Sequence, residues 1–254
     1  MPEKDDVSLN DERFSRYYPV VQQERRLIAG SVVSKFIEKW DRKGKVLIPG
    51  YGRGGTMMDL WMSGFDNYYG LDLNLAALKS SRLENRLVQA NISKMPFPEN
   101  SFDYAAITDV FQDFGNFDDL VDGLKSIAKT MKKGGQILLT NPTSESYKVE
   151  TKLFDCSKFP ENIKAVEFGM GREAKGRMKT VGRNGERLEF DFTDHVWRDE
   201  DLEEAFELAG LKKIFKERPL ARDDTNLPNY LGVHDWISET KVPSWVVYLL
   251  EVSK

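Results

Sequence analysis

The sequence predicts an α/β protein with a doubly wound, mostly parallel sheet and helices on both of its faces. The first observation behind this prediction is that short apolar runs alternate with segments of helical periodicity between residues 45 and 141. Such alternation of strands and helices is typical of parallel sheets that are covered on both sides. The second observation is that the first apolar run leads directly into a glycine-rich turn, GYGRGG, and then into a helical segment.

The first strand and its turn predict a nucleotide-binding element. Residues 46–48 are apolar and bounded by glycine and proline, which predicts a strand buried on both faces. Glycines follow at positions 50, 52, 54 and 55, and residues 56–63 contain no helix breaker. Glycine allows positive φ angles and lets a ligand approach the backbone closely, while the free N–H groups of a helix N-terminus point at that ligand.

The next strand indicates what the turn binds. The glycine pattern alone fits the G-x-G-x-x-G of dinucleotide sites, the G-x-G-x-G of S-adenosylmethionine (SAM) sites and an ordinary glycine-rich turn. The predicted strand at 67–71 ends at Asp72, about 20 residues after Gly50, where an acidic side chain accepts hydrogen bonds from ribose hydroxyls. The spacing therefore predicts an adenosine-containing cofactor and leaves its identity open.

The remaining elements of this half repeat the alternation and bring polar residues to one edge. The sequence predicts helices at 75–85 and 119–131, strands at 86–90, 104–108 and 136–140, and an ordered proline-rich loop at 91–103. Residues 132–135 (KKGG) are expected to end the second helix, with cations in its last turn and glycine as its C-cap. Gly50, Asp72, Asn91 and Asp109 then each follow one of the first four strands, at the edge where ligands of such sheets bind.

The segments outside this half predict a helical start and an antiparallel addition. Residues 1–12 are expected to form a loose tail, and residues 13–40 a helix that covers one side of the sheet. An alternative is that Phe14, Tyr17 and Tyr18 form a lid over the cofactor. Asn-Gly within residues 176–197 predicts a β-hairpin, and the sequence then predicts an amphipathic helix at 199–210 and strands at 212–217 and 245–252.

Composition excludes several classes of protein. With 254 residues, 40% hydrophobic and 31% charged, the chain predicts one large domain, or one domain with an insertion. No apolar run approaches the roughly 20 residues of a membrane helix, and the polar N-terminus predicts a cytoplasmic protein. A single cysteine, Cys156, and two histidines argue against a disulfide and against a metal site, and a net charge of −4 argues against a nucleic-acid partner.

Four segments together resemble the class I SAM-dependent methyltransferases, in their small-molecule, type-11-like form. They are VLIPGYGRGG, YYGLDLN, VQANISKMPFPENSFDYAAITDVF and MKKGGQILLTNP, and they cover roughly residues 40–142. The resemblance implies a Rossmann-like, seven-stranded, mostly parallel sheet with an antiparallel hairpin insertion, residues 143–198, that covers the substrate side. It also implies a methyltransferase domain over residues 41–254 with SAM as the cofactor, and the helical pattern before this domain predicts an N-terminal cap or lid at 1–40.

The resemblance also assigns cofactor-binding residues. The glycine turn would face the methionine part of SAM, the acid after the second strand its ribose, and the residues after the third strand its adenine. In this sequence the set is Gly50, Tyr51, Gly52, Gly54, Asp72, Leu73, Asn91, Ile92 and Asp109. Two positions depart from the family pattern: Ile48 stands where an acidic residue is usual near the end of the first strand, and Asn91 where Asp is frequent. The carbonyl oxygen of Asn91 can still accept a hydrogen bond from adenine.

Methyl transfer is an in-line displacement, so positioning supplies much of its acceleration, and a base is needed only for a protonated acceptor. His195 is the candidate base because its ordinary pKa lies near 6.5, with capping or packing as the alternative role. Asp109 is the second candidate catalytic residue, and Asp113 could also orient an amine or a hydroxyl. Candidate substrate contacts are Tyr17, Tyr18, His195, Trp197 and His234.

Three functions are compatible with these residues. The first is transfer of a methyl group from SAM to an O or N atom of a small organic molecule. The second is a module that holds SAM or its product S-adenosylhomocysteine (SAH) without turnover, an alternative that Ile48 suggests. The third is an NAD(P)-dependent oxidoreductase, since the glycine pattern also fits a dinucleotide.

Overall fold

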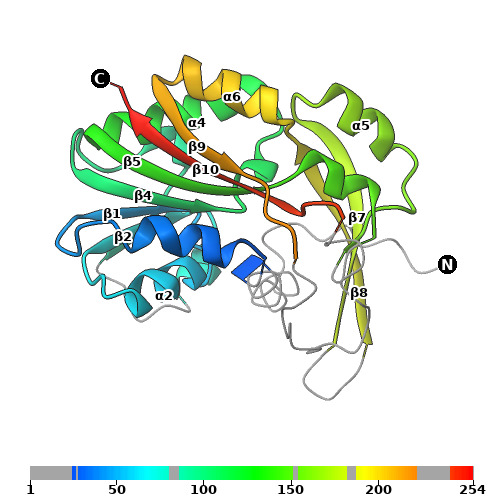
Figure 1. Cartoon of the computed structure of the whole chain (residues 1–254), viewed down its shortest axis with the longest axis horizontal. Coiled ribbons are helices and arrows are strands. Elements are labelled where there is room, and N and C mark those ends of the chain that lie inside the picture. Colours follow the sequence, from blue (N-terminus) through cyan, green and yellow to red (C-terminus); the bar gives the residue numbers. More distant parts are fainter. Residues whose placement is uncertain are drawn as a thin grey trace.

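Two sheets organise the protein (Figure 1). The structure is a computed structural model that describes residues 25–26, 28–79, 86–150, 154–181, 187–221 and 241–253. In the larger sheet the strands follow the order β3-β2-β1-β4-β5-β10-β9. Their bounds are β1 Val46–Pro49, β2 Tyr68–Asp72, β3 Leu87–Gln89, β4 Phe102–Thr108, β5 Met131–Pro142, β9 Leu211–Glu217 and β10 Trp245–Val252.

The strand order places a ligand crevice beside β1. Strands β3, β2, β1, β4 and β5 are parallel, and β10 pairs antiparallel with both β5 and β9. From β1 the chain passes outward to β2 and β3 and then returns to β4 on the other side of β1. Ligands of open α/β sheets bind where the strand order reverses in this way. The predicted fold class, a seven-stranded and mostly parallel sheet, is confirmed.

Helices cover both faces of this sheet (Figure 1). Successive residues of β1 enter different halves of the core: Val46 and Ile48 pack on the side of α2, whereas Leu47 packs on the side of α4 and α6. Residues 28–37 are helical and join the first half, as the sequence predicts for this part of the chain. The α-helices are α2 Gly55–Met62, α3 Leu75–Lys79, α4 Phe117–Thr130, α5 Asn162–Phe168 and α6 Asp199–Leu208.

The predicted role of residues 132–135 as a helix C-cap is wrong. Helix α4 ends at Thr130, and β5 begins at Met131, whose backbone is already extended (φ −80°, ψ 148°). Lys132 Nζ lies 2.7 Å from Asp103 Oδ1 on β4, and Gly134 supplies a positive φ of 71° where the register between β4 and β5 shifts. The two lysines and two glycines, which resemble a helix end in the sequence, thus form the irregular first part of β5.

The antiparallel addition forms the second sheet. Its strands are β6 Phe154–Asp155, β7 Arg172–Val181 and β8 Arg187–Val196, in the order β6-β7-β8. The pairing of β7 with β8 extends to Val181 opposite Arg187, which confirms the predicted hairpin, while its Asn-Gly turn lies outside the described residues. Tyr17, Tyr18 and His234 also lie outside them. Within the described ranges no helix combines the length and apolarity needed to cross a membrane.

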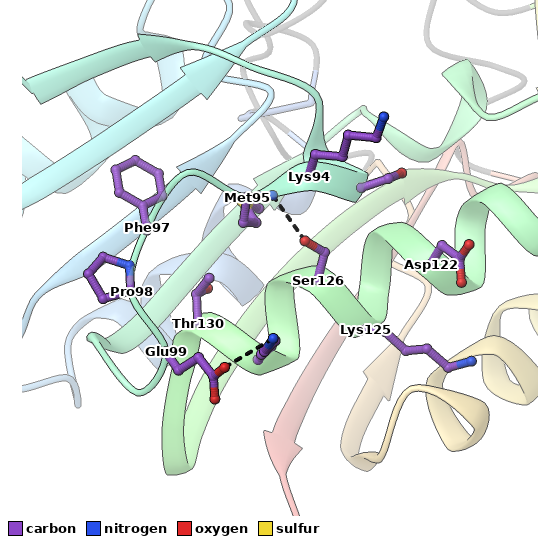
Figure 2. Close-up of a pocket in the computed structure, with 11 residues that line it drawn as sticks. Lys94, Met95, Phe97, Pro98, Glu99, Asp122, Lys125, Ser126 and Thr130 are labelled. Carbon is purple, nitrogen blue, oxygen red and sulfur yellow. Dashed lines mark hydrogen bonds and ion pairs between the residues drawn. The ribbon is translucent and has the colours of Figure 1, made fainter.

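The loop after β3 is fixed against α4 (Figure 2). Its short helix η2, Ile92–Lys94, packs on α4, and the N–H of Met95 donates a hydrogen bond to Ser126 Oγ at 3.1 Å. Lys129 Nζ on α4 pairs with Glu99 Oε1 at 3.0 Å. A pocket of about 530 Å³ lies between the loop and the helix. These contacts hold the residues that follow β3 at the edge of the sheet.

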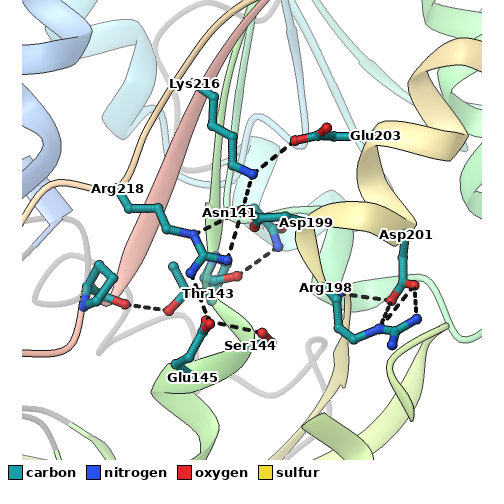
Figure 3. Close-up of polar contacts among 12 residues, drawn as sticks. Asn141, Thr143, Ser144, Glu145, Arg198, Asp199, Asp201, Glu203, Lys216 and Arg218 are labelled. Carbon is teal, nitrogen blue, oxygen red and sulfur yellow. Dashed lines mark hydrogen bonds and ion pairs between the residues drawn. The ribbon is translucent and has the colours of Figure 1, made fainter. Parts of the chain in front are cut away.

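An ion network joins three elements near the opposite edge of the sheet, where β9 lies (Figure 3). Arg218, just after β9, contacts Asp199 Oδ2 at the start of α6 at 2.8 Å and Glu145 Oε1 at 2.9 Å. Glu145 belongs to η4, Ser144–Lys148, which follows β5. Lys216 binds Asp199 and also Glu203 Oε1, the latter at 2.9 Å. The network therefore ties the edge strand to α6 and to the start of the antiparallel addition.

Replacing Arg218 with methionine is expected to lower the free energy of unfolding by about 1–2 kcal/mol at pH 7. Burial opposes ionisation of Asp199 and Glu145, but hydrogen bonds and charges, those of Arg218 among them, outweigh burial and lower both pKa values. Carboxyls with lowered pKa values stabilise the fold above their ordinary pKa values and lose this contribution as pH falls below about 4. Urea unfolding from pH 7 downward should therefore show the difference from wild type shrinking. Lys212→Met on the same strand is the control, and an effect that stays constant with pH would contradict the prediction.

Candidate functional site

A pocket of about 600 Å³ opens at the carboxyl ends of β1, β2, β3 and β4. The loops that follow these four strands form its walls. Seven of the nine predicted cofactor-binding residues line it: Gly50, Gly52, Asp72, Leu73, Asn91, Ile92 and Asp109. It is also lined by residues that the sequence did not single out for the cofactor, including Arg53, Asn74, Ser93, Gln112, Asp113, Phe114 and Gly115.

The glycine turn requires its glycines. Gly50, Gly52 and Gly54 have φ angles of 66°, 54° and 86°, a region that other residues rarely adopt. A Cβ atom on Gly50 would lie 2.3 Å from Cγ2 of Val110, so the turns after β1 and β4 pack too closely for any side chain. Gly54 is the N-cap residue of α2.

Tyr51 packs its buried ring between the turn and β2. Its side chain is only 2% exposed, and its ring occupies the space beside Gly70, where a Cβ would lie 2.3 Å from Cδ2 of the tyrosine. The backbone N–H of Tyr51 donates a hydrogen bond to the carbonyl of Leu71, which links the turn to β2. Neither Tyr51 nor Gly54 is among the described residues that line the pocket. Both therefore affect the pocket only through the shape of the turn.

Asp72 faces the glycine turn. Its Oδ2 accepts a hydrogen bond from the N–H of Gly52 at 2.7 Å, and its Oδ1 accepts one from the N–H of Asn74 at 2.8 Å. The carboxylate therefore joins the turn after β1 to the turn after β2 while it lines the pocket. The neighbouring Leu73 is 63% exposed and presents an apolar surface to the same space.

The residues after β3 form a capped turn. Asn91 Oδ1 accepts a hydrogen bond from the N–H of Ser93 at 2.8 Å, which starts η2. A carbonyl oxygen has two lone pairs, so this amide keeps one acceptor position for a ligand. Ile92 is mostly buried and lines the pocket together with Ser93 and Lys94.

Asp109 lies after β4 in a strained and buried position. Its φ is 52°, a conformation that non-glycine residues seldom adopt. Oδ1 accepts a hydrogen bond from Trp245 Nε1 at 3.1 Å, and Oδ2 lies 3.5 Å from Nε of the buried Arg25. Burial raises the pKa of Asp109 to about 6, although Arg25 and Trp245 act in the opposite direction. Arg25 and Trp245 carry no local sequence signal for this role.

The end of β8 holds the loop after β4. His195 Nδ1 is 3.0 Å from the carbonyl oxygen of Gln112, and Trp197 Nε1 donates to the carbonyl of Phe111 at 2.7 Å. Both carbonyls belong to η3, Phe111–Asp113. Because a carbonyl oxygen only accepts, Nδ1 of His195 is the donor of this hydrogen bond, and Nε2 is the ring nitrogen left for another contact.

His195 and Trp197 lie one layer behind the pocket, since neither is among the described residues that line it. Nε2 of His195 faces Gly115, where an added Cβ would be 3.3 Å away, and Gly115 itself lines the pocket. Trp197 is 2% exposed and packs against Gly171. The geometry gives both residues a positioning role, and only Nε2 of His195 comes near the pocket wall.

A group of acids surrounds the same loop. Asp194 on β8 accepts a hydrogen bond from the hydroxyl of the buried Tyr147 at 2.9 Å. Burial and the charge of Asp109 raise the pKa of Asp194 to about 7, against the lowering effect of Tyr147. Asp113 is exposed and lines the pocket, and its pKa is raised by its surroundings, with desolvation first and then the charges of Asp194, Asp72 and Asp109. No group of side chains in the described ranges is arranged to hold a metal ion.

Comparison with known proteins identifies the domain that contains this pocket. Residues 47–139 match a family model described as a methyltransferase domain. This range contains the glycine turn, Asp72, Asn91 and Asp109, which are walls of the pocket. The chain carries a class I SAM-dependent methyltransferase domain. SAM is accordingly the cofactor of this methyltransferase, and no curated protein matches its sequence significantly.

Solved structures support the same fold over nearly the whole methyltransferase. A SAM-dependent methyltransferase from Clostridium acetobutylicum superposes with a TM-score of 0.62 at 14% identity, covering 96% of this chain and 99% of the other. The complex between the Haloferax volcanii Trm112 methyltransferase activator and a methyltransferase gives 0.61 at 15%, covering 97% and 100%. Geranyl diphosphate C-methyltransferase from Streptomyces coelicolor, in complex with Mg²⁺, geranyl diphosphate and SAH, gives 0.55 at 12%, covering 87% and 77%.

Ile48 remains a departure from the family pattern in the structure. Its side chain is buried in the core with Val46, so the end of β1 offers no carboxylate to the pocket. Asp72 and Asp109 are the carboxylates that reach the pocket from the ends of β2 and β4.

Proposed function

We propose that this methyltransferase transfers a methyl group from SAM to an O or N atom of a small organic molecule. The observation that carries the proposal is the Asp72 carboxylate, which bonds to the glycine turn and lines the pocket at the reversal of strand order. SAM supplies an activated methyl group on sulfur when it is bound. The Streptomyces neighbour acts on carbon, which makes a carbon acceptor the alternative within the same chemistry.

In this proposal each wall of the pocket binds one part of the cofactor. The backbone of Gly50 and Gly52 lies against the methionine part, and Asp72 accepts from the ribose hydroxyls while it keeps its backbone bonds. Leu73 covers one face of adenine, and the remaining acceptor of Asn91, with Ile92, borders its edge. Asp109 faces the ammonium of the methionine end.

The chain's own residues then align the acceptor. His195 and Trp197 fix the loop that carries Gln112 and Asp113, and such positioning accounts for much of the rate of a displacement. A role for His195 as a base stays part of the proposal and would act past Gly115, where no side chain blocks Nε2. Residues 143–198 are proposed to cover the substrate and residues 1–40 to act as a lid, with Tyr17, Tyr18 and His234 as candidate contacts outside the described ranges.

Calorimetric titration with SAM and with SAH tests the cofactor site. Micromolar binding of both is the expected result, and no heat or thermal shift at millimolar SAM would refute the proposal. Methyl transfer to any acceptor would then exclude the alternative of a non-catalytic SAM-binding module. NADH binding without SAM binding would instead indicate an oxidoreductase.

SAM affinity is expected to rise with pH between 5 and 7. The pKa of Asp109 is raised to about 6 in the protein without cofactor, so its carboxylate is mostly protonated at pH 5 and mostly ionised at pH 7. If this carboxylate pairs with the ammonium of SAM, Kd should fall about tenfold over this range. Calorimetry at several pH values measures the effect in wild type and in Asp109→Asn, for which the pH dependence should flatten. Equal wild-type affinities at both ends would contradict the assignment.

We also propose the cellular compartment and the binding partners of the enzyme. Cys156 is buried and carries no disulfide, which is compatible with a reducing cytoplasm. A small-molecule acceptor is the proposed partner, without nucleic acid or membrane. The Haloferax neighbour was solved with an activator protein, so a protein activator is a second candidate partner for this chain.

A further inference from the structure

One end of the pocket carries an acidic side chain that the cofactor site does not require. Asp113 lines the pocket on η3, and its side chain is exposed there. Within the described ranges it forms no ion pair. The acids Asp194, Asp72 and Asp109 act on it electrostatically, while Arg53 and Lys94 line the same pocket from the turns after β1 and β3. A carboxylate in this position lowers its electrostatic energy when a cation enters the pocket.

The side chain next to it is a buried acceptor without a partner. Gln112 is 9% exposed and lines the same pocket. Its Nε2 donates a hydrogen bond to the carbonyl oxygen of Asp109 at 2.7 Å, which fixes the orientation of the amide. Its Oε1 is buried and has no hydrogen-bond partner among the described residues. A buried acceptor left unpaired costs about 1–3 kcal/mol, so the site gains when a ligand brings an N–H group.

A second layer adds to this negative field. Asp194 lies behind the loop and is held by the hydroxyl of Tyr147 at 2.9 Å. Arg25 pairs with two other acids: its Nε lies 3.5 Å from Oδ2 of Asp109, and its Nη2 contacts Asp59. These ion pairs, and not Asp113, take up its positive charge. The loop after β4 thus presents one charged and one neutral acceptor, backed by a further acid.

We propose that the methyl acceptor is an amine that enters the pocket as an ammonium ion and is bound by Asp113 and Gln112 Oε1. This inference rests on the proposed function and narrows its acceptor from O or N to N. An alcohol or phenol would have to form an anion beside several carboxylates, which raises the pKa of its hydroxyl. An ammonium ion gains from the same charges.

The step balances without any further reagent. The ammonium gives one proton to the Asp113 carboxylate and becomes a neutral amine with a free lone pair. This lone pair forms the bond to the methyl carbon, while the electron pair of the breaking carbon–sulfur bond stays on sulfur. The products are the N-methylated ammonium and SAH, and the proton on Asp113 passes to water.

Binding to the SAH-saturated enzyme tests the proposal, because SAH lacks the sulfonium charge that could itself account for the acids. The probes are benzylamine and benzyl alcohol, then n-hexylamine and n-hexanol, titrated by calorimetry at pH 7.5. Each amine is expected to bind at least tenfold more tightly than its alcohol. Asp113→Asn should remove most of this preference, and Asp118→Asn, an exposed acid at the start of α4, should leave it unchanged.

The outcomes separate the two proposals. If SAH does not bind, the proposed function fails together with this inference. If SAH binds but neither amine exceeds its alcohol, including the case in which no probe binds, only the amine inference is overturned. A preference that survives in Asp113→Asn also overturns it. Gln112→Met provides a second variant, expected to weaken amine binding several-fold, should Asp113→Asn fold poorly by its melting curve.

Discussion

Replacing Asp72 with asparagine is expected to weaken SAM binding by about 10- to 100-fold. The carboxylate accepts hydrogen bonds from the N–H groups of Gly52 and Asn74 and lines the pocket at the ribose position of the proposal. Hydrogen bonds to a charged acceptor contribute about 1.5–3 kcal/mol, and an amide offers one acceptor where two N–H groups converge. Its amide nitrogen would face a donor, so the glycine turn should also lose its fixed shape.

Calorimetry with SAM measures the loss, and Asp66→Asn is the matched control. Asp66 lies just before β2, at the opposite end of the strand that Asp72 closes, and its side chain is exposed. The control should keep wild-type affinity. Unchanged SAM affinity in a folded Asp72→Asn protein would remove the observation on which the proposed function rests.

The glycine turn and Asp72 could be predicted because their signals are local. A buried strand, a glycine run and an acid at the next strand end follow one another within about 25 residues, and parallel topology brings strand ends to one edge. The structure places Gly50, Asp72, Asn91 and Asp109 around one pocket, as this argument requires. The antiparallel hairpin was predictable for the same reason, since Asn-Gly between alternating runs is itself a local signal.

Long-range partners were not predictable in this way. Trp245 reaches Asp109 from 136 positions along the chain, and Arg25 reaches it from the opposite direction. The KKGG segment misled the prediction because its local chemistry suits a helix end, whereas the decisive contact is Lys132 with Asp103, 29 positions earlier on the neighbouring strand. Pairing between strands thus overrode a local preference.

The histidine and tryptophan at the end of β8 illustrate a further limit. Their residue types suit a substrate site, but what they contact depends on how the second sheet meets the loop after β4. Both use a ring N–H to hold a backbone carbonyl of η3. The acceptor-binding residues proposed above, Gln112 and Asp113, lie on that loop. Its functional residues became apparent only once the contact between the two sheets was known.

Replacing Asn162 with alanine is expected to lower the free energy of unfolding by about 3 kcal/mol or more. Asn162 is 1% exposed, and its Nδ2 lies within hydrogen-bond distance of the carbonyl oxygens of Tyr147, Cys156 and Lys175, at 2.9, 3.2 and 2.7 Å. Its Oδ1 accepts from the N–H of Lys175 at 2.9 Å. Alanine would remove all of these hydrogen bonds, and a buried backbone group left unpaired costs about 1–3 kcal/mol.

The neighbouring Ile163 supplies the control, because its side chain is 60% exposed on the same helix. Ile163→Ala should change stability by less than about 0.5 kcal/mol in urea unfolding. Asn162 joins η4 to β7, and Tyr147 of η4 also holds Asp194 behind the pocket. The amide should therefore act on the acceptor site as well as on stability. If Asn162→Ala unfolds at the same urea concentration as Ile163→Ala, the antiparallel sheet is held by other contacts, and the fixed position of Tyr147 must have another cause.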